Sequence, residues 1–297
     1  MTQPLSPGSR LRAALNAERP LQIAGAINAY CAMLAGRAGF RAIYLSGAGV
    51  ANASYGLPDL GITTLNDVIE DVRRITRATD LPLLVDCDTG WGGAFLIERC
   101  VREMEAAGAA GIHLEDQVQA KRCGHRPGKA LVSAGEMADR VRSAVDARRD
   151  PAFVIMARTD AYSAEGFEAA IDRSRQYLEA GADMIFAEAM TSLDEYRCFV
   201  QAVRAPVLAN LTEFGKTPLF SLDEMRSTGV AIVLYPLSAF RAMSEAARRV
   251  YESLRAGESQ RDLLPGMQTR EQLYDVLGYH AYEQKLDALF ADKREKE

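Results

Sequence analysis

The feature that most constrains the fold is a recurring unit, in which a helical stretch ends at glycine and an apolar, β-rich run follows. The unit is clearest at residues 38–43, 107–112, 180–185 and 228–233. A glycine just past a helix supplies the left-handed conformation that turns the chain into the next strand. Collecting the apolar runs gives eight expected strands, near residues 21–25, 41–46, 82–88, 110–115, 152–158, 183–188, 206–210 and 230–236.

Helical stretches alternate with these runs. Amphipathic segments separate most of them, at residues 65–78, 95–107, 135–148 and 167–180. Strand–helix alternation repeated eight times predicts an α/β fold, a closed parallel (β/α)8 barrel. The 297 residues suit one such barrel as a single domain. A doubly wound open sheet is the alternative. It is less favoured because eight units close naturally and no G-x-G-x-x-G follows the first strand.

One C-terminal segment falls outside the barrel count. Thr269-Arg270-Glu271-Gln272 forms a T-x-x-Q capping box that opens a helix expected over residues 269–290. This helix carries an apolar stripe that includes Leu273, Leu277 and Phe290. The barrel already has its ring of helices, so we expect a partner subunit to cover the stripe. The charged residues 291–297 are expected to be disordered.

Composition excludes several classes of protein. The net charge of −5 provides no global basic field for nucleic acid or an anionic membrane. Five cysteines without a C-x-x-C pair argue against a disulfide framework and a thiolate zinc site. The N-terminus lacks the pattern of a secretory signal, and the most apolar stretch, residues 23–40, is interrupted by polar side chains. We therefore expect a cytoplasmic protein.

Polar residues gather where the expected strands end. Residues two apart along a strand share a face, which gives the pairs Tyr44 and Ser46, Asp86 and Asp88, His113 and Glu115, Arg158 and Asp160, Phe186 and Glu188, Asn210 and Thr212, and Leu234 and Pro236. These pairs are expected to point into the barrel mouth, where the active site lies in this fold. Two carboxylates on one face repel unless a cation lies between them. Oxygen ligands without a His/Cys cluster favour Mg²⁺ or Mn²⁺, so Asp86 and Asp88 form a candidate metal site.

The loop after the fourth expected strand, residues 116–132, is unusually long and basic. Within it Cys123 has Arg122 beside it and Lys121 and His125 within two residues, a setting that can lower the pKa of a thiol. The alternative interpretation is a solvated basic patch. The other cysteines, Cys31, Cys87, Cys100 and Cys198, lie in apolar contexts and are expected to be inert packing residues.

At this loop the sequence resembles a known family. Lys121-Arg122-Cys123-Gly124-His125 is similar to the K-[KR]-C-G-H signature of the isocitrate lyase and phosphoenolpyruvate mutase superfamily. Further matching motifs cover nearly the whole chain: Ser46-Gly47, Gly56-Leu57-Pro58-Asp59, Asp86-x-Asp88, His113-Leu114-Glu115-Asp116-Gln117, Ala157-Arg158-Thr159-Asp160 and Tyr235-Pro236-Leu237-Ser238-Ala239-Phe240-Arg241.

The resemblance implies a set of site residues. Asp86 and Asp88 would hold Mg²⁺, with Mn²⁺ as the alternative ion, and Asp59 and Glu115 would lie near its water shell. The implied substrate contacts are Ser46, Gly47, Ala48, Cys123, Gly124, Arg158, Glu188, Asn210, Leu211, Thr212, Arg241 and Arg270. The resemblance also implies a homotetramer whose C-terminal helices are exchanged between neighbours.

The implied activity is retro-aldol-type cleavage of 2-methylisocitrate to pyruvate and succinate, a step of the methylcitrate cycle of propionate catabolism. Tyr44 is the candidate base and Cys123 the acid that protonates the leaving carbanion, with Arg122 and His125 beside it. Asn210, Thr212 and Arg241 would spread the developing charge. An apolar pocket for the substrate methyl group is expected from Phe186, Leu234 and Pro236.

Several alternatives remain at this stage. The enzyme alternatives are an isocitrate lyase or an oxaloacetate-type decarboxylase or hydrolase of the same superfamily. A non-catalytic ligand-binding barrel predicts eroded strand ends, which the sequence does not show. A nucleic-acid module is favoured weakly by the basic loop and opposed by the net charge.

Overall fold

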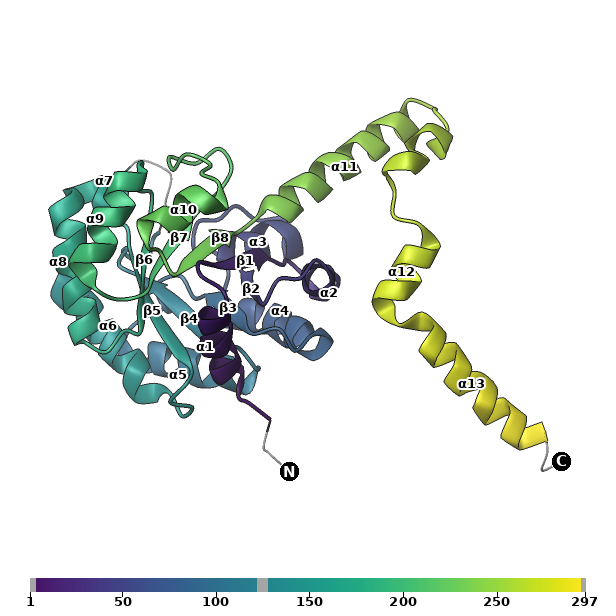
Figure 1. Ribbon diagram of the computed structural model, residues 1–297, viewed down its shortest axis with the longest axis horizontal. Coiled ribbons are helices and arrows are strands. Elements are labelled where there is room, and N and C mark those ends of the chain that lie inside the picture. Colours follow the sequence, from purple (N-terminus) through teal and green to yellow (C-terminus); the bar gives the residue numbers. More distant parts are fainter. Residues whose placement is uncertain (1–3, 122–127, 295–297) are drawn as a thin grey trace. The chain divides into compact units, whose positions relative to one another are not determined.

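Eight parallel strands form a closed barrel in the computed structural model, which describes residues 4–121 and 128–294 (Figure 1). The strands are β1 (Leu21–Gly25), β2 (Ala42–Leu45), β3 (Leu83–Asp86), β4 (Gly111–Glu115), β5 (Val154–Thr159), β6 (Met184–Ala187), β7 (Val207–Asn210) and β8 (Ile232–Tyr235). Each strand pairs with the next along the chain, and β1 pairs with β8 to close the ring. The predicted barrel is confirmed, and each strand lies within or next to its expected range.

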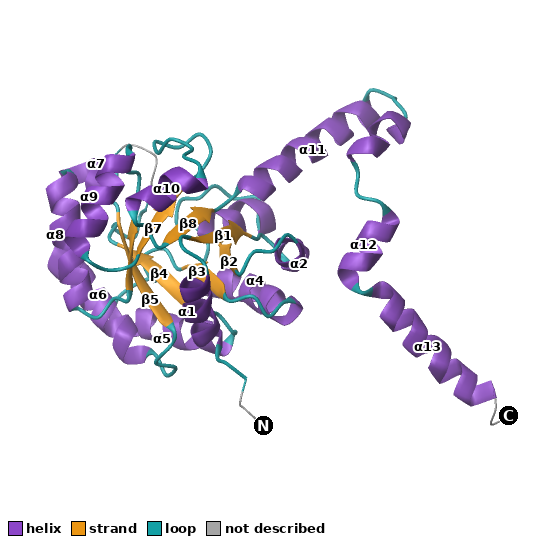
Figure 2. Ribbon diagram, viewed as in Figure 1, coloured by secondary structure: helices purple, strands orange, loops and turns teal. Residues whose placement is uncertain are grey.

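Helices surround the orange strands of the barrel in Figure 2. They are α1 (Pro7–Ala17), α2 (Ala29–Arg37), α3 (Gly47–Gly49), which continues into the π-helix η1 (Val50–Ser54), α4 (Leu65–Ala78), α5 (Ala94–Ala106), α6 (Ala134–Ala147), α7 (Ala161–Glu165), α8 (Phe167–Glu179), α9 (Leu193–Val203) and α10 (Leu222–Thr228). Capping boxes such as Thr64 with Asp67 satisfy amide donors at helix starts. None of the helices in the described ranges is long and apolar enough to cross a bilayer.

The core has two layers, as the two-residue period of the strands predicts. The inner layer fills the barrel and includes Ile23, Leu84, Met156 and Phe186, with Leu11 of α1 packed against it. The outer layer lies between strands and helices and contains the intervening strand residues, among them Ile43, Val85, Ile112, Ile155 and Val233. Because successive residues alternate between these layers, every second side chain near the end of a strand points toward the barrel interior.

The chain divides into two compact units, Met1–Phe240 and Arg241–Glu297. The second unit contains most of α11 (Ser238–Arg255), the 3-10 helix η2 (Gln260–Gly266), α12 (Arg270–Leu277) and α13 (Tyr279–Arg294).

One expectation for the C-terminal segment is wrong. Where one helix was expected over residues 269–290, Gly278 adopts a left-handed conformation, with φ of 66°, and ends α12 before α13 begins. Residues 291–294 of the expected tail belong to α13. The rest of the expected tail, residues 295–297, lies outside the described residues.

Candidate active site

Polar side chains from β2, β3 and β4 meet at the carboxyl ends of the strands. The Tyr44 hydroxyl lies 2.9 Å from His113 Nε2 and donates to Asp86 Oδ2 at 3.3 Å. All three side chains are buried. Burial, followed by the nearby charge of Asp86, raises the pKa of Tyr44 well above its usual value. Burial lowers the pKa of His113 to about 4, so its imidazole is neutral at pH 7. These three groups form one wall of the mouth.

The two candidate metal ligands lie next to each other and beside a glycine. Asp86 accepts hydrogen bonds from the amides of Gly47 and Asp88, each at 3.0 Å. Asp88 itself adopts a left-handed backbone conformation, with φ of 48°, which is costly for a residue other than glycine. A Cβ placed on Gly47 would lie 3.0 Å from Asp88 Oδ1 and 3.2 Å from Asp86 Oδ2. The absence of a side chain at position 47 therefore leaves room beside both carboxylates.

A buried lysine neutralises part of this acidic centre. The Lys121 ammonium lies 2.6 Å from Asp88 Oδ1 and also forms an ion pair with Asp59. Burial disfavours ionisation of Asp86, but His113, Lys121 and Arg158 favour it, and together they lower the pKa of Asp86 to about 2. Burial, with the charges of Asp86 and Asp59, raises the pKa of Asp88 to about 7 although Lys121 opposes the rise.

The residues present fit a divalent cation that keeps part of its water shell. Within the described ranges, no three His, Cys, Asp or Glu side chains converge as a complete ligand set. Mg²⁺ commonly takes one or two carboxylates and retains water, so Asp86 and Asp88 are sufficient in number. Glu115 Oε1 is buried and accepts no hydrogen bond from any residue that the structure describes. Such an oxygen is suited to accept a hydrogen bond from a metal-bound water.

On β5, the neighbour of β4, Arg158 is surrounded by carboxylates. Its guanidinium lies 3.0 Å from Asp160, 3.3 Å from Glu115 and 3.3 Å from Glu188. It also lies 5.1 Å from the centre of the Phe186 ring, within the range of a cation–π contact. Asn210 Nδ2 donates to Glu188 at 3.3 Å. These contacts join the carboxyl ends of β4, β5, β6 and β7 in one ionic cluster.

Most of the other expected site residues in the first unit are buried, but not all of them point toward the mouth. Ser46 and Thr212 are buried at the ends of β2 and β7, and Ala48 is half-buried in α3. The Leu211 side chain packs in the outer layer, while its amide donates to the Leu234 carbonyl at 2.9 Å. The proposed methyl-pocket residues, Phe186, Leu234 and Pro236, are all buried.

Some expected site residues cannot be placed in this cluster. Arg122, Cys123, Gly124 and His125 lie outside the described residues. Arg241 and Arg270 belong to the second unit, within which both are exposed. One expectation about packing is wrong, because Cys198 lies on an exposed face of α9. Its apolar neighbours Phe199 and Tyr196 are the residues that α9 buries.

Sequence reasoning did not assign a site role to Lys121, Lys129, Asp116 or Asp160. Lys121, Asp116 and Asp160 are buried, and Lys129 is half-buried. Lys121 pairs with Asp88 and Asp59, Lys129 lies 2.6 Å from Asp160, and the Asp160 amide donates to Asp116. Their positions in the sequence could have indicated a site role, since the two aspartates follow strand ends and the two lysines lie in the basic loop.

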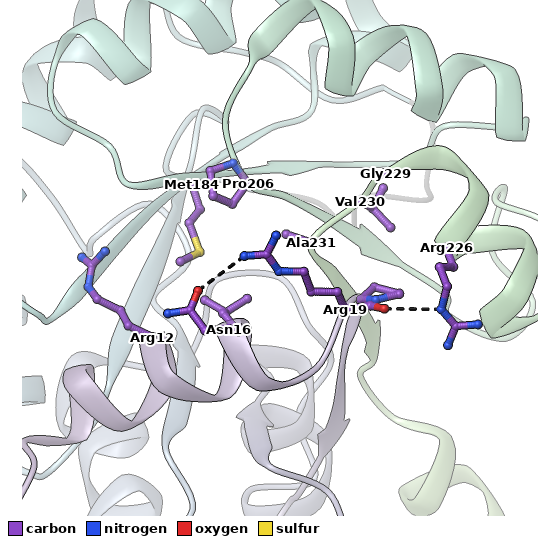
Figure 3. A pocket seen from close by; sticks show the side chains of 11 residues that line it. Arg12, Asn16, Arg19, Met184, Pro206, Arg226, Gly229, Val230 and Ala231 are labelled. Atoms are coloured by element: carbon purple, nitrogen blue, oxygen red, sulfur yellow. Dashed lines mark hydrogen bonds between the residues drawn. The ribbon is translucent and has the colours of Figure 1, made fainter.

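A cavity of about 560 Å³ lies at the other end of the barrel (Figure 3). Its lining includes Arg12, Arg19 and Arg226, together with Met184 and other residues at the starts of β6, β7 and β8. Arg12 lies 2.7 Å from Asp183, and Arg226 is paired with Asp223. Two of its three arginines are thus neutralised by the chain's own carboxylates, and catalytic groups of this fold lie at the opposite end.

Fold and mouth together define the chain as a (β/α)8-barrel enzyme with a carboxylate-rich centre at the carboxyl ends of its strands. Residues 11–255 match the family model described as phosphoenolpyruvate phosphomutase, and the chain belongs to this family. It is 60% identical over 294 residues to the 2-methylisocitrate lyase of Shewanella oneidensis, an alignment that covers 99% of this chain and all of that protein.

Solved structures of related enzymes have the same architecture. A crystal structure of 2,3-dimethylmalate lyase matches with a TM-score of 0.86 at 36% identity, over 96% of both chains. A phosphonopyruvate hydrolase in complex with oxalate and Mg²⁺ matches with a TM-score of 0.82 at 30% identity, over 97% of this chain and 99% of that one. The family resemblance expected from the sequence is confirmed.

Proposed function

We propose that this chain is a Mg²⁺-dependent carbon–carbon lyase that cleaves 2-methylisocitrate to pyruvate and succinate, as in the methylcitrate cycle. The observation that carries the proposal is the barrel mouth, where the carboxylates of Asp86 and Asp88 lie beside Gly47, which has no side chain, and Arg158 lies among the ends of neighbouring strands. The 60% identity to a 2-methylisocitrate lyase supports this choice of substrate within the family.

Asp86 and Asp88 would hold the Mg²⁺, while Asp59 and Glu115 would contact its water shell. When bound, the ion would act as a Lewis acid for the hydroxyl and carboxylate of the half that becomes pyruvate. The Lys121 ammonium keeps Asp88 and Asp59 close together while it neutralises part of their charge. Gly47 supports Asp86 through its amide and leaves space for the ion.

The remaining residues would bind the substrate carboxylates and stabilise the leaving half. Arg158 presents a fixed cation to a carboxylate, which it can bind with two parallel hydrogen bonds. Asn210, Thr212 and Arg241 would donate hydrogen bonds to the charge that develops on the succinate half. Cys123 would protonate the resulting carbanion. Phe186, Leu234 and Pro236 would enclose the methyl group of the substrate. A pocket for one methyl group discriminates between substrates with and without it by about 1–3 kcal/mol.

Tyr44 remains the proposed base. Its hydroxyl donates to Asp86, which holds it at the mouth beside the proposed metal ligands. The neutral imidazole of His113 holds Tyr44 from the other side.

Product analysis by NMR tests the proposed reaction. The protein would be incubated with 2-methylisocitrate and with isocitrate in parallel, each with Mg²⁺ and with excess EDTA. We expect pyruvate and succinate from 2-methylisocitrate in the presence of Mg²⁺ only, and a lower kcat/KM for isocitrate. Full activity in EDTA would exclude the metal role. An equal or higher kcat/KM for isocitrate would identify isocitrate as the better substrate.

The assembly and location of the enzyme belong to the same proposal. A homotetramer with exchanged C-terminal helices is supported by α11 and α12, neither of which buries a residue in the single chain. A cytoplasmic location is supported by Cys87 and Cys100, which are buried and hydrogen-bonded to each other and yet form no disulfide.

A further inference from the structure

Arg158 is held by a buried carboxylate that does not itself line the metal centre. Asp160, fully buried at the start of α7, accepts from Arg158 Nε at 3.0 Å and from Arg158 Nη2 at 3.3 Å. These two bonds reach two of the three guanidinium nitrogens and therefore fix the plane of the group as well as its position. Glu115 and Glu188 each contact a different terminal nitrogen, Nη1 and Nη2, at 3.3 Å.

This arrangement divides the guanidinium into two edges. Asp160 takes the edge formed by Nε and Nη2, whereas the edge formed by Nη1 and Nη2 is directed to Glu115 and Glu188, which line the mouth. A substrate carboxylate that binds in a bidentate manner needs one complete edge of the guanidinium. Asp160 occupies the edge formed by Nε and Nη2. A substrate carboxylate would therefore bind at the edge formed by Nη1 and Nη2, in place of Glu115 and Glu188.

Asp160 is in turn fixed from three sides. Lys129 Nζ lies 2.6 Å from its carboxylate, and Gln117 Nε2 donates to it at 3.4 Å. Its backbone amide donates to Asp116 Oδ1 at 2.9 Å. The carboxylate of Asp160 therefore has little freedom to rotate.

Asp116 anchors this group to the outer shell of the barrel. Thr159 Oγ1 and Tyr177 Oη donate to Asp116 Oδ2 at 2.8 and 2.9 Å, and Arg173 lies 3.6 Å from the same oxygen. Arg173 also forms a two-pronged pair with Glu165, at 2.7 and 2.6 Å. The line from α8 through Asp116 and Asp160 to Arg158 is thus continuous.

We propose that Asp160 is a positioning residue for substrate binding: it orients the Arg158 guanidinium so that the edge toward the mouth accepts a substrate carboxylate, and Asp116 holds it in place. The inference deepens the proposed function and rests on Arg158 as a carboxylate-binding residue. Asp160 itself touches neither substrate nor metal in this assignment. Its removal should weaken binding of the substrate and of the transition state by the same factor.

The test is Asp160→Asn, which keeps the shape and removes the charge. We expect KM for 2-methylisocitrate to rise about tenfold or more, with kcat within about threefold of wild type, as for an interaction made equally in both states. A purely structural loss would reduce the fraction of active enzyme, and hence kcat, without changing KM. An unchanged KM in the folded variant would overturn the proposal.

Asp183→Asn is the matched control at the far end of the barrel. Asp183 also accepts from two arginines, Arg12 and Arg148, both at 2.7 Å, and from the Ile155 amide at 2.9 Å. We expect this variant to lower the melting temperature and leave KM unchanged. An equal rise of KM in Asp183→Asn would show that the rise does not come from the Arg158–Asp160 contact, and it would overturn the proposal.

Two further measurements keep the proposal testable. If Asp160→Asn does not fold, Thr159→Val removes one donor to Asp116 and should raise KM in the same direction by about threefold. If the wild-type enzyme does not cleave 2-methylisocitrate, the proposed function fails, and a crystal structure of Asp160→Asn then decides on Asp160. A guanidinium of Arg158 in the wild-type orientation would refute the positioning role, and a rotated one would support it.

Discussion

At the scale of single residues, two neighbouring carboxylates at the mouth, Asp86 and Asp88, have different pKa values. Burial disfavours the charge on both, but Asp86 lies near His113, Lys121 and Arg158 and its pKa falls to about 2. Asp88 experiences burial and the charge of Asp86, so its pKa rises to about 7 in spite of Lys121. The split follows from mutual repulsion of two buried anions, and a divalent cation between them would remove its cause.

Cys123 carries the residue-scale prediction. Cys123→Ser keeps the shape of the side chain but replaces the thiol with a far weaker acid. We expect kcat to fall at least about 10²-fold, the lower range for a lost general acid, with little change in substrate binding. Steady-state kinetics with 2-methylisocitrate would measure this, and Cys198→Ser on the exposed face of α9 is the control. Turnover near that of wild type would exclude Cys123 as the acid.

At the scale of elements, the turns that follow strands shape the site. Asp88 after β3 and Ala189 after β6 both adopt left-handed conformations, with φ of 48° and 63°. In each turn an amide donates to a neighbouring carboxylate, from Asp88 to Asp86 at 3.0 Å and from Ala189 to Glu188 at 2.9 Å. Strained backbone of this kind persists where the surrounding structure determines it strongly, and here it fixes site carboxylates.

Gly47, at the junction of β2 and α3, gives the prediction at this scale. In Gly47→Ala the new Cβ would lie 3.0–3.2 Å from the carboxylates of Asp88 and Asp86 and would fill the space beside them. We expect Mg²⁺ affinity, measured by calorimetry, to fall about tenfold or more, a loss comparable to that of a disrupted outer-shell contact. Gly93→Ala is the control, because a Cβ there meets nothing within 4 Å. Equal affinities of the two variants would contradict the role of this space.

At the scale of the whole molecule, the second unit by itself leaves several large apolar side chains exposed. Tyr251, Leu264, Leu286, Leu289 and Phe290 are all exposed, and four of these five side chains expose more than half of their area. Scattered exposed apolar residues are ordinary, but a run of them along successive helices is typical of an interface. This surface lies on the segment that the family resemblance implies is exchanged between subunits.

We therefore predict a tetramer in solution. Analytical ultracentrifugation at micromolar concentration should show this species for the wild type. The double variant Leu277→Asp/Phe290→Asp should dissociate, because each apolar side chain contributes about 1.5–3 kcal/mol when fully buried. Lys285→Asp, a charge change on α13 between these positions, is the control and should remain assembled. A monodisperse wild-type monomer would refute the prediction.

The sequence was sufficient for the barrel and for the acidic residues at its mouth. Eight apolar runs with a two-residue period define both the number of strands and the face of each residue, so Asp86, Asp88, Glu115 and Glu188 could be placed at one end. The break at Gly278 and the exposure of Cys198 were not predicted. The first depends on a single backbone conformation, and the second on which face of α9 meets the barrel.

Only the tertiary structure decided which charges are partners. Lys121 belongs to a basic loop in the sequence, yet it is buried between Asp59 and Asp88. Arg158 and Asp160 share a strand end, but the contacts of Asp160 with Lys129 and Asp116 join segments that are 31 and 44 residues apart. Periodicity reports the face on which a side chain lies. The pairing of charges depends on distances across the closed barrel, which exist only once all eight strands are in register.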